Sequence, residues 1–220
     1  MSGWFKRKNE LMSQIPFYPN SKDNTSCYPA CLRMVLKHFL PAKNFSMKSL
    51  NKIVAKKKGL WTWPMHGLIS LKKMGFDIEY YEDFDYLKFA QEGEKYLIKK
   101  YGKKVGQAQI DNSDITYERK AAAHFTKTFK FYQKAPTLKD LKRLIRKGYL
   151  AGCSCNYYAL YDKKGYSGHF VLVFDINDKH VYFHDPGRPA RPNQKRTLKQ
   201  FINAWAYPDK NATSIQAFKL

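Results

Sequence analysis

The stretch 168–187 constrains the fold more than any other part of this sequence. Its apolar run over residues 168–176 predicts a β-strand, and the Asn-Asp pair at 177–178 is a turn signal. Residues 180–184 predict a second strand, which the Asp-Pro-Gly sequence at 185–187 ends. We therefore expect an antiparallel hairpin that forms part of a larger sheet.

Two polar residues at one end of this hairpin point to chemistry. His169 begins the first strand and Asp185 follows the second, so an antiparallel pairing makes them neighbours at one end of the sheet. A carboxylate in that place can hold an imidazole in one tautomer and stabilise its cation. Alternation directs His184 to the opposite face, so His169 is the better candidate base. The structural alternative is a strand-end histidine beside an aspartate that only caps its turn.

A cysteine at the start of a predicted helix is the candidate nucleophile. A polar, extended approach ends at Cys27, Pro29 follows, and apolar residues with helical spacing continue to Phe39. Backbone N–H groups and the helix dipole favour a thiolate there. With a base and a carboxylate expected from the hairpin, Cys27 completes a nucleophilic set. The alternative is a thiol buried in the core.

The order of the expected elements indicates an α+β fold in which N-terminal helices pack on a C-terminal antiparallel sheet. The length of 220 residues suits a single domain over residues 1–220. The polar, lysine-rich segment at about 86–125 is expected to be a helical insertion. Further helices are expected at 28–39, 46–57, 67–74, 136–147 and 197–205, and further strands at 76–81, 128–133, 149–157 and 212–218. The basic residues between 188 and 196 are interpreted as an exposed loop.

The chain is strongly basic, with 40 Lys plus Arg against 18 Asp plus Glu and a net charge of +22. Such a balance predicts attraction to nucleic acid, anionic membrane surfaces or acidic proteins. Because the basic residues are dispersed, solvated helix faces are the alternative. We find no zinc-finger, helix-turn-helix or RNP-type signature, and no motif bears on the oligomeric state.

Cysteine spacing and the N-terminal residues bear on location and metals. The charged residues 1–10 are not followed by an apolar stretch of secretory length, so we expect no signal peptide, no transmembrane segment and a cytoplasmic protein. Reduced thiols are then the default. The pairs Cys27/Cys31 and Cys153/Cys155 have poor zinc spacing. We expect no metal and no other cofactor.

The same residues carry a resemblance to a known family. Three motifs are similar, in order and spacing, to those of a C39-like, papain-fold cysteine peptidase domain: Cys27-Tyr28-Pro29-Ala30 with Met34, Gly168-His169, and Asp185-Pro186. The resemblance covers roughly residues 14–75 and 137–220. It implies that Cys27 attacks an acyl carbon, that His169 transfers the proton and that Asp185 orients His169.

Two positions depart from the family pattern. The glycine that follows the family's cysteine is Tyr28 here, and the glutamine of the oxyanion hole is absent. Aligning Pro16 with the proline of the family's entry loop brings Asn20 to the glutamine's place. Asparagine has the same amide donor on a side chain one methylene shorter, so Asn20 is the expected partner of the Cys27 N–H in binding the oxyanion.

The resemblance implies a thiol protease that hydrolyses a peptide or isopeptide bond of a peptide or protein substrate through a thioester. An acyltransferase on the same fold is one alternative, and a catalytically weak basic module that binds nucleic acid or an acidic protein is another. Trp61, Trp63 and His66 are the expected substrate contacts. The alternative for these three is a packing cluster at a helix entry.

Overall fold

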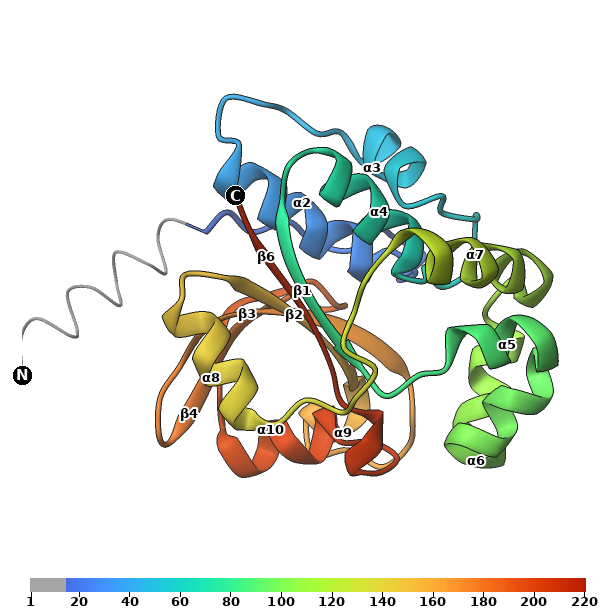
Figure 1. Ribbon diagram of the computed structural model, residues 1–220. Helices are drawn as coiled ribbons and strands as arrows, with labels where there is room; N and C mark the ends of the chain where they lie inside the picture. The colour runs from blue at the N-terminus through green and yellow to red at the C-terminus, as the bar shows by residue number, and fades with distance from the viewer. Residues whose placement is uncertain (1–14) are drawn as a thin grey trace, which may run out of the picture.

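An antiparallel sheet lies at the centre of the computed structural model, which describes residues 15–220 (Figure 1). Its strands lie in the order β1-β6-β2-β3-β4-β5, and each neighbouring pair is antiparallel. The last strand therefore lies between the first two. The strands are β1 (Asp77–Glu82), β2 (Leu150–Asn156), β3 (Gly168–Ile176), β4 (His180–Asp185), β5 (Arg191–Thr197) and β6 (Ser214–Lys219).

Helices cover both faces of this sheet (Figure 1). On one side are α2 (Cys27–Phe39), α3 (Met47–Ile53), α4 (Met65–Lys73) and α7 (Ile115–Thr128). On the other are α8 (Leu138–Arg146), α9 (Tyr157–Leu160) and α10 (Leu198–Trp205), while α5 (Tyr86–Glu92) and α6 (Glu94–Asp111) lie beside the sheet. The predicted α+β arrangement of helices packed on an antiparallel sheet is confirmed.

Helix α2 packs on strand β3 and buries most of its apolar residues. Its apolar residues recur at helical spacing, and Leu32 and Val35 are fully buried. Burial of one such side chain contributes about 1.5–3 kcal/mol. The Cys31 thiol donates to the carbonyl of Phe170 over 3.6 Å, and the Tyr28 ring meets the Phe170 ring edge-on. These contacts fix the start of α2 over the start of β3.

The predicted hairpin is present as β3 and β4. Its register pairs Ile176 with Val181 and Leu172 with His184, and a bulge interrupts the pairing between Val173 and Asp175. The Asn177 side chain closes the turn by accepting the N–H groups of residues 179 and 180. Asp185 follows His184 at the end of β4 and thus lies near the start of β3, where His169 is found.

Three local predictions were wrong. Helix α3 ends at Ile53, before the predicted residue 57, because Ala55 adopts a left-handed φ of 51°. Residues 128–133 form only an isolated bridge between Tyr132 and Tyr81. The predicted basic loop contains the edge strand β5, whose charged side chains suit an edge exposed to water.

Residues 86–125 are helical as predicted and form α5, α6 and most of α7. Gly93 at φ 59° separates the first two, and Gly102 at φ 75° interrupts α6. Helices α5 and α7 pack on each other, and α7 contacts α4. That this segment is an insertion into one domain over residues 1–220 stays a prediction.

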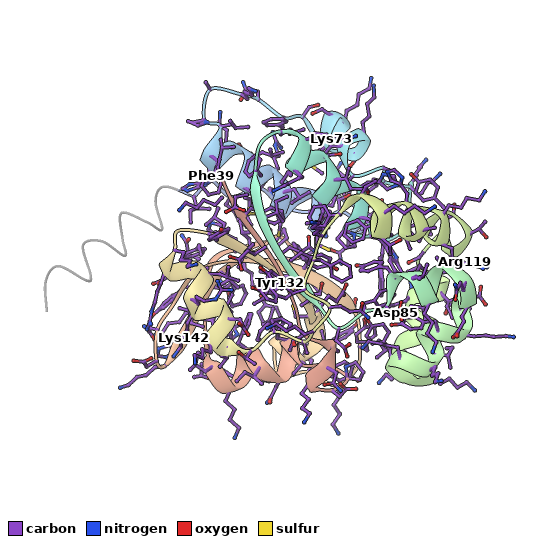
Figure 2. The ribbon with its side chains drawn as sticks, in the orientation of Figure 1. Phe39, Lys73, Asp85, Arg119, Tyr132 and Lys142 are labelled. Carbon is purple, nitrogen blue, oxygen red and sulfur yellow. The ribbon has the colours of Figure 1, made fainter. Side chains whose placement is uncertain are left out.

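Basic side chains are distributed around the molecule. Lys73, Arg119 and Lys142 lie on three different sides of its outline in Figure 2. The charged stretch 1–10 lies outside the described residues. Within residues 15–220, no helix combines the length and the apolar character needed to cross a membrane.

Candidate active site

The end of the hairpin and the start of α2 bring Cys27, His169 and Asp185 together. The His169 Nε2–H donates to Asp185 Oδ1 over 2.6 Å, because an ionised carboxylate only accepts. Cys27 interacts electrostatically with the same imidazole, and both residues line one cavity. Since Nε2 is occupied by the carboxylate, Nδ1 is the nitrogen left for the thiol. The ring therefore lies between a sulfur and a carboxylate.

The pKa of His169 is raised to about 10. Burial by itself would lower this pKa, but hydrogen bonds to Asp185 and Cys27 and the charges of both groups outweigh it. The charged imidazole is thus the favoured form beside Cys27 near neutral pH. A thiolate next to an imidazolium is the reactive form of a cysteine nucleophile.

Asp185 is fully buried, and each of its carboxylate oxygens accepts at least one hydrogen bond. Oδ1 also accepts the Gly187 N–H over 2.7 Å, and Oδ2 accepts the Tyr161 hydroxyl and lies 3.7 Å from Arg191 Nη1. Burial opposes ionisation, yet the hydrogen bond and charge of His169 together with these donors lower the pKa of Asp185. The carboxylate stays ionised and keeps the imidazole ring in place.

A tyrosine shields the His169–Asp185 pair. The Tyr157 ring meets the imidazole edge-on, with ring centroids 5.2 Å apart. Arg191 Nη1 donates to the Tyr157 hydroxyl, and the Arg191 guanidinium lies 4.2 Å from the centre of the Tyr161 ring. These two tyrosines and Arg191 were not predicted from sequence, because no local pattern marks them.

A cavity of about 170 Å³ opens beside Cys27 and His169. Trp61 and Trp63 line it as predicted, and their part in substrate binding stays a prediction. His66 is not among its lining residues: its ring stacks on Tyr117, and His66 Nε2 lies 3.0 Å from the Tyr117 hydroxyl. Its position therefore gives no support to a substrate contact.

Comparison with known protein families finds a match over most of the chain. The model of the Peptidase C39 like family matches residues 10–213, which include Cys27, His169, Asp185 and the helical segment 86–125. The chain belongs to the C39-like peptidase family. A search of curated proteins finds no match.

The entry loop of this C39-like protein is tied to the turn that follows Asp185. The Asn20 N–H donates to the carbonyl of Pro186 over 2.8 Å, and Arg188 Nε donates to the carbonyl of Ser21 over 3.0 Å. The loop ends at Ser26, which directly precedes Cys27. These bonds hold Cys27 and Asp185 near each other although 158 positions separate them in the sequence.

The Asn20 amide organises this loop. It is buried, its oxygen accepts the Ser26 N–H over 2.7 Å, and its nitrogen donates to Asn24 Oδ1 over 2.9 Å. An amide nitrogen carries two hydrogens, so one N–H remains beyond the bond to Asn24. Asn20 does not line the cavity, and its part in an oxyanion hole stays a prediction.

The tyrosine that replaces the family's glycine is accommodated by α4. The Tyr28 hydroxyl donates to the carbonyl of Pro64 over 3.2 Å. A Cβ at Gly67 would lie 2.5 Å from that hydroxyl, so the absence of a side chain at residue 67 leaves room for Tyr28. Tyr28 becomes part of the cavity wall without displacing Cys27.

The other three cysteines differ from Cys27. Cys31, Cys153 and Cys155 are buried, whereas Cys27 is half-buried, and all four are free thiols. Burial raises the pKa of the three buried thiols, which disfavours their reactive thiolate form. Lys56 lies close enough for its charge to interact with Cys27, and its Nζ donates to Thr25 Oγ1 over 2.9 Å. Cys27 is the best placed nucleophile.

Substituting Gly187→Ala is expected to lower activity by about 10²-fold, the loss that a displacement of roughly 1 Å can cause. The new Cβ would lie 2.8 Å from Asp185 Oδ1 and 3.1 Å from His169 Cε1. Steady-state kinetics measure the loss, and thermal unfolding shows whether the fold is retained. A folded variant with wild-type activity would mean that this close approach does not hold the pair in place.

Proposed function

We propose that this C39-like protein is a cysteine-dependent hydrolase of peptide or isopeptide bonds. The observation that carries the proposal is the His169 ring, which is hydrogen-bonded to Asp185, interacts with Cys27 and lines one cavity with it. A buried base held between a thiol and a carboxylate is the arrangement that nucleophilic thiol catalysis needs.

In the reactive pair, His169 carries the proton that the Cys27 thiol has given up. The thiolate attacks the carbonyl carbon of the substrate, and the carbonyl oxygen becomes an oxyanion. When the C–N bond breaks, His169 gives the proton to the leaving amine, which leaves a thioester on Cys27. His169 then removes a proton from water, the hydroxide attacks the thioester, and the carboxylic acid and the thiol are released.

The remaining groups hold this geometry and stabilise charge. Asp185 keeps the Nε2 side of His169 occupied, so Nδ1 carries out the proton transfers. The first N–H groups of a helix have no acceptor inside it, so the Cys27 N–H is available to the oxyanion. We assign the second donor to the Asn20 amide, by the N–H that does not bind Asn24.

Covalent labelling with site mapping tests this function. A peptidyl vinyl sulfone is expected to modify the native protein at Cys27 in one-to-one stoichiometry, as found by mass spectrometry of the digested protein. Cys31, Cys153 and Cys155 should stay unmodified because they are buried. Modification of another cysteine, or none, would contradict the mechanism. Peptide turnover with an added amine separates hydrolysis from acyl transfer, since a transferase forms the new amide.

A further inference from the structure

The lining of the cavity beside Cys27 differs in composition from the rest of the molecule. Lysine and arginine make up 40 of the 220 residues, yet neither is among the described residues that line the cavity. Glu82, the last residue of β1, is its lining carboxylate. A basic protein thus presents an acceptor-rich pocket at its candidate active site.

The two oxygens of the Glu82 carboxylate differ in their hydrogen bonds. Both hydrogen bonds that it accepts from residues 15–220 fall on Oε2, from the hydroxyls of Tyr80 and Tyr86, the latter over 2.7 Å. Oε1 takes part in neither. Lys100, whose charge Glu82 also senses, pairs instead with Asp83 over 2.8 Å. Burial raises the pKa of Glu82 despite these donors, so a bound cation would relieve the cost of its charge.

A second buried acceptor lines the same cavity. Gln216 of β6 is 2% exposed, and its Oε1 has no hydrogen-bond partner among the described residues. The register pairs Gln216 with Tyr80, two residues before Glu82 on the same face of β1. A buried acceptor without a donor costs about 1–3 kcal/mol. A ligand that donates a hydrogen bond to Gln216 Oε1 would remove this cost.

Aromatic rings line the same cavity as these acceptors and Cys27. Phe84 and Tyr101 stack with centroids 6.3 Å apart, and both line the cavity together with Trp63. Such faces accommodate the methylene stem of a long side chain and attract a cation. The cavity therefore combines an apolar wall with buried acceptors.

We propose that this cavity is a specificity subsite for a lysine side chain of the peptide substrate, whose ammonium group binds Glu82 Oε1 and Gln216 Oε1. The proposal rests on the proposed function and names its substrate class. Lysine is favoured over arginine because the carboxylate offers one oxygen, whereas a guanidinium is best matched by two parallel acceptors. The three N–H groups of a lysine ammonium point in different directions, so two of them can bind two separate acceptors.

Matched covalent probes test the subsite. Three peptidyl vinyl sulfones differ only in carrying lysine, norleucine or glutamate next to the electrophile, and a second set carries these residues one position earlier. In one of the two sets, the lysine probe should modify Cys27 roughly 10- to 100-fold faster than norleucine, the gain of a charge-assisted hydrogen bond, and glutamate should be slowest. The second-order rate constant of labelling is the readout.

Two variants and a matched control assign the preference to the cavity. Glu82→Gln should remove most of the lysine advantage, while Asp83→Asn, which removes the neighbouring charge outside the cavity, should keep it. Gln216→Leu should lower the advantage by about 3- to 10-fold, as the loss of one hydrogen bond would. It gives a second measure if Glu82→Gln does not fold. Iodoacetamide labelling of Cys27, which needs no subsite, should be equal in all folded variants.

The outcomes separate this subsite from the proposed function. If the probes modify Cys27 at the same rate in both sets, or if folded Glu82→Gln keeps the full lysine preference, the cation subsite is wrong and the hydrolase mechanism stands. If no peptidyl probe modifies Cys27 in the native protein, the proposed function fails and the subsite fails with it.

Discussion

Replacing Cys27 by alanine is expected to lower the rate of peptide hydrolysis by on the order of 10⁴- to 10⁶-fold, the range found when a catalytic nucleophile is removed. Without Sγ no thioester forms, and His169 and Asp185 have no nucleophile to activate. The free energy of unfolding should change by less than about 1 kcal/mol, because Cys27 is half-buried and alanine is a good helix former. Catalysis and stability should thus separate at this position.

Initial rates and urea unfolding measure these two quantities on the same preparations. Cys153→Ala is the matched control: it removes a fully buried thiol from β2, so it should lower stability while retaining wild-type turnover. Wild-type turnover by a folded Cys27→Ala protein would exclude Cys27 as the nucleophile. Equal loss of turnover in both variants would point to misfolding as the cause.

The parts of the fold that were predictable are those in which one face of an element is buried. The periodic apolar residues of α2 and the apolar run of β3 are the residues that contact the core, so the sequence alone predicts these elements. Strand β5 has no apolar pattern, because an edge strand exposed to water needs no apolar face. The order of the strands was also not predictable. Periodicity assigns faces to strands, but it does not place β6 between β1 and β2.

The residues of the candidate site also divide into those that the sequence predicted and those that it did not. Cys27 was predicted to lie at the start of a helix. Hairpin geometry predicted that His169 and Asp185 are neighbours, and the structure confirms this with 2.6 Å between His169 Nε2 and Asp185 Oδ1. Tyr161 and Glu82 were missed because their surroundings come from distant segments. Tyr161 directly follows the short helix α9, and Glu82 and Gln216 line one cavity because β6 pairs with β1.

Substituting Asp185→Ala is expected to lower activity by about 10³- to 10⁴-fold, as loss of the orienting carboxylate does in a triad. It should also destabilise the protein by about 3–5 kcal/mol, because one member of a buried charge pair would lose its partner. The Tyr161 hydroxyl and the Gly187 N–H would lose their acceptor as well. Unlike Cys27→Ala, this change should therefore affect catalysis and stability together.

Asp185→Asn is the matched control, because it retains the size of the side chain and an oxygen. The amide oxygen can still accept the His169 Nε2–H and the Gly187 N–H, and the Tyr161 hydroxyl can turn to accept from the amide nitrogen. The variant should fold with a smaller stability loss and keep more activity than Asp185→Ala. If the two variants have equal stability and equal activity, the hydrogen bonds to this side chain do not orient His169.

The pH dependence of stability gives an independent measure of the same pair. The folded-state pKa of His169, about 10, exceeds its ordinary value of 6.5, so its contribution is complete below about pH 6.5 and is lost as pH rises through 10. The pKa of Asp185 lies below its ordinary 3.8, so its contribution is present above that value and is lost as pH falls through the folded-state pKa. Urea unfolding should thus show the wild type losing stability between about pH 6.5 and 10, with a shallower loss in Asp185→Ala. The loss should not vanish, because the bond between His169 and Cys27 also raises the histidine pKa. Parallel profiles for the two proteins would mean that Asp185 does not stabilise the imidazolium, and His169 would then owe its charge to Cys27 alone.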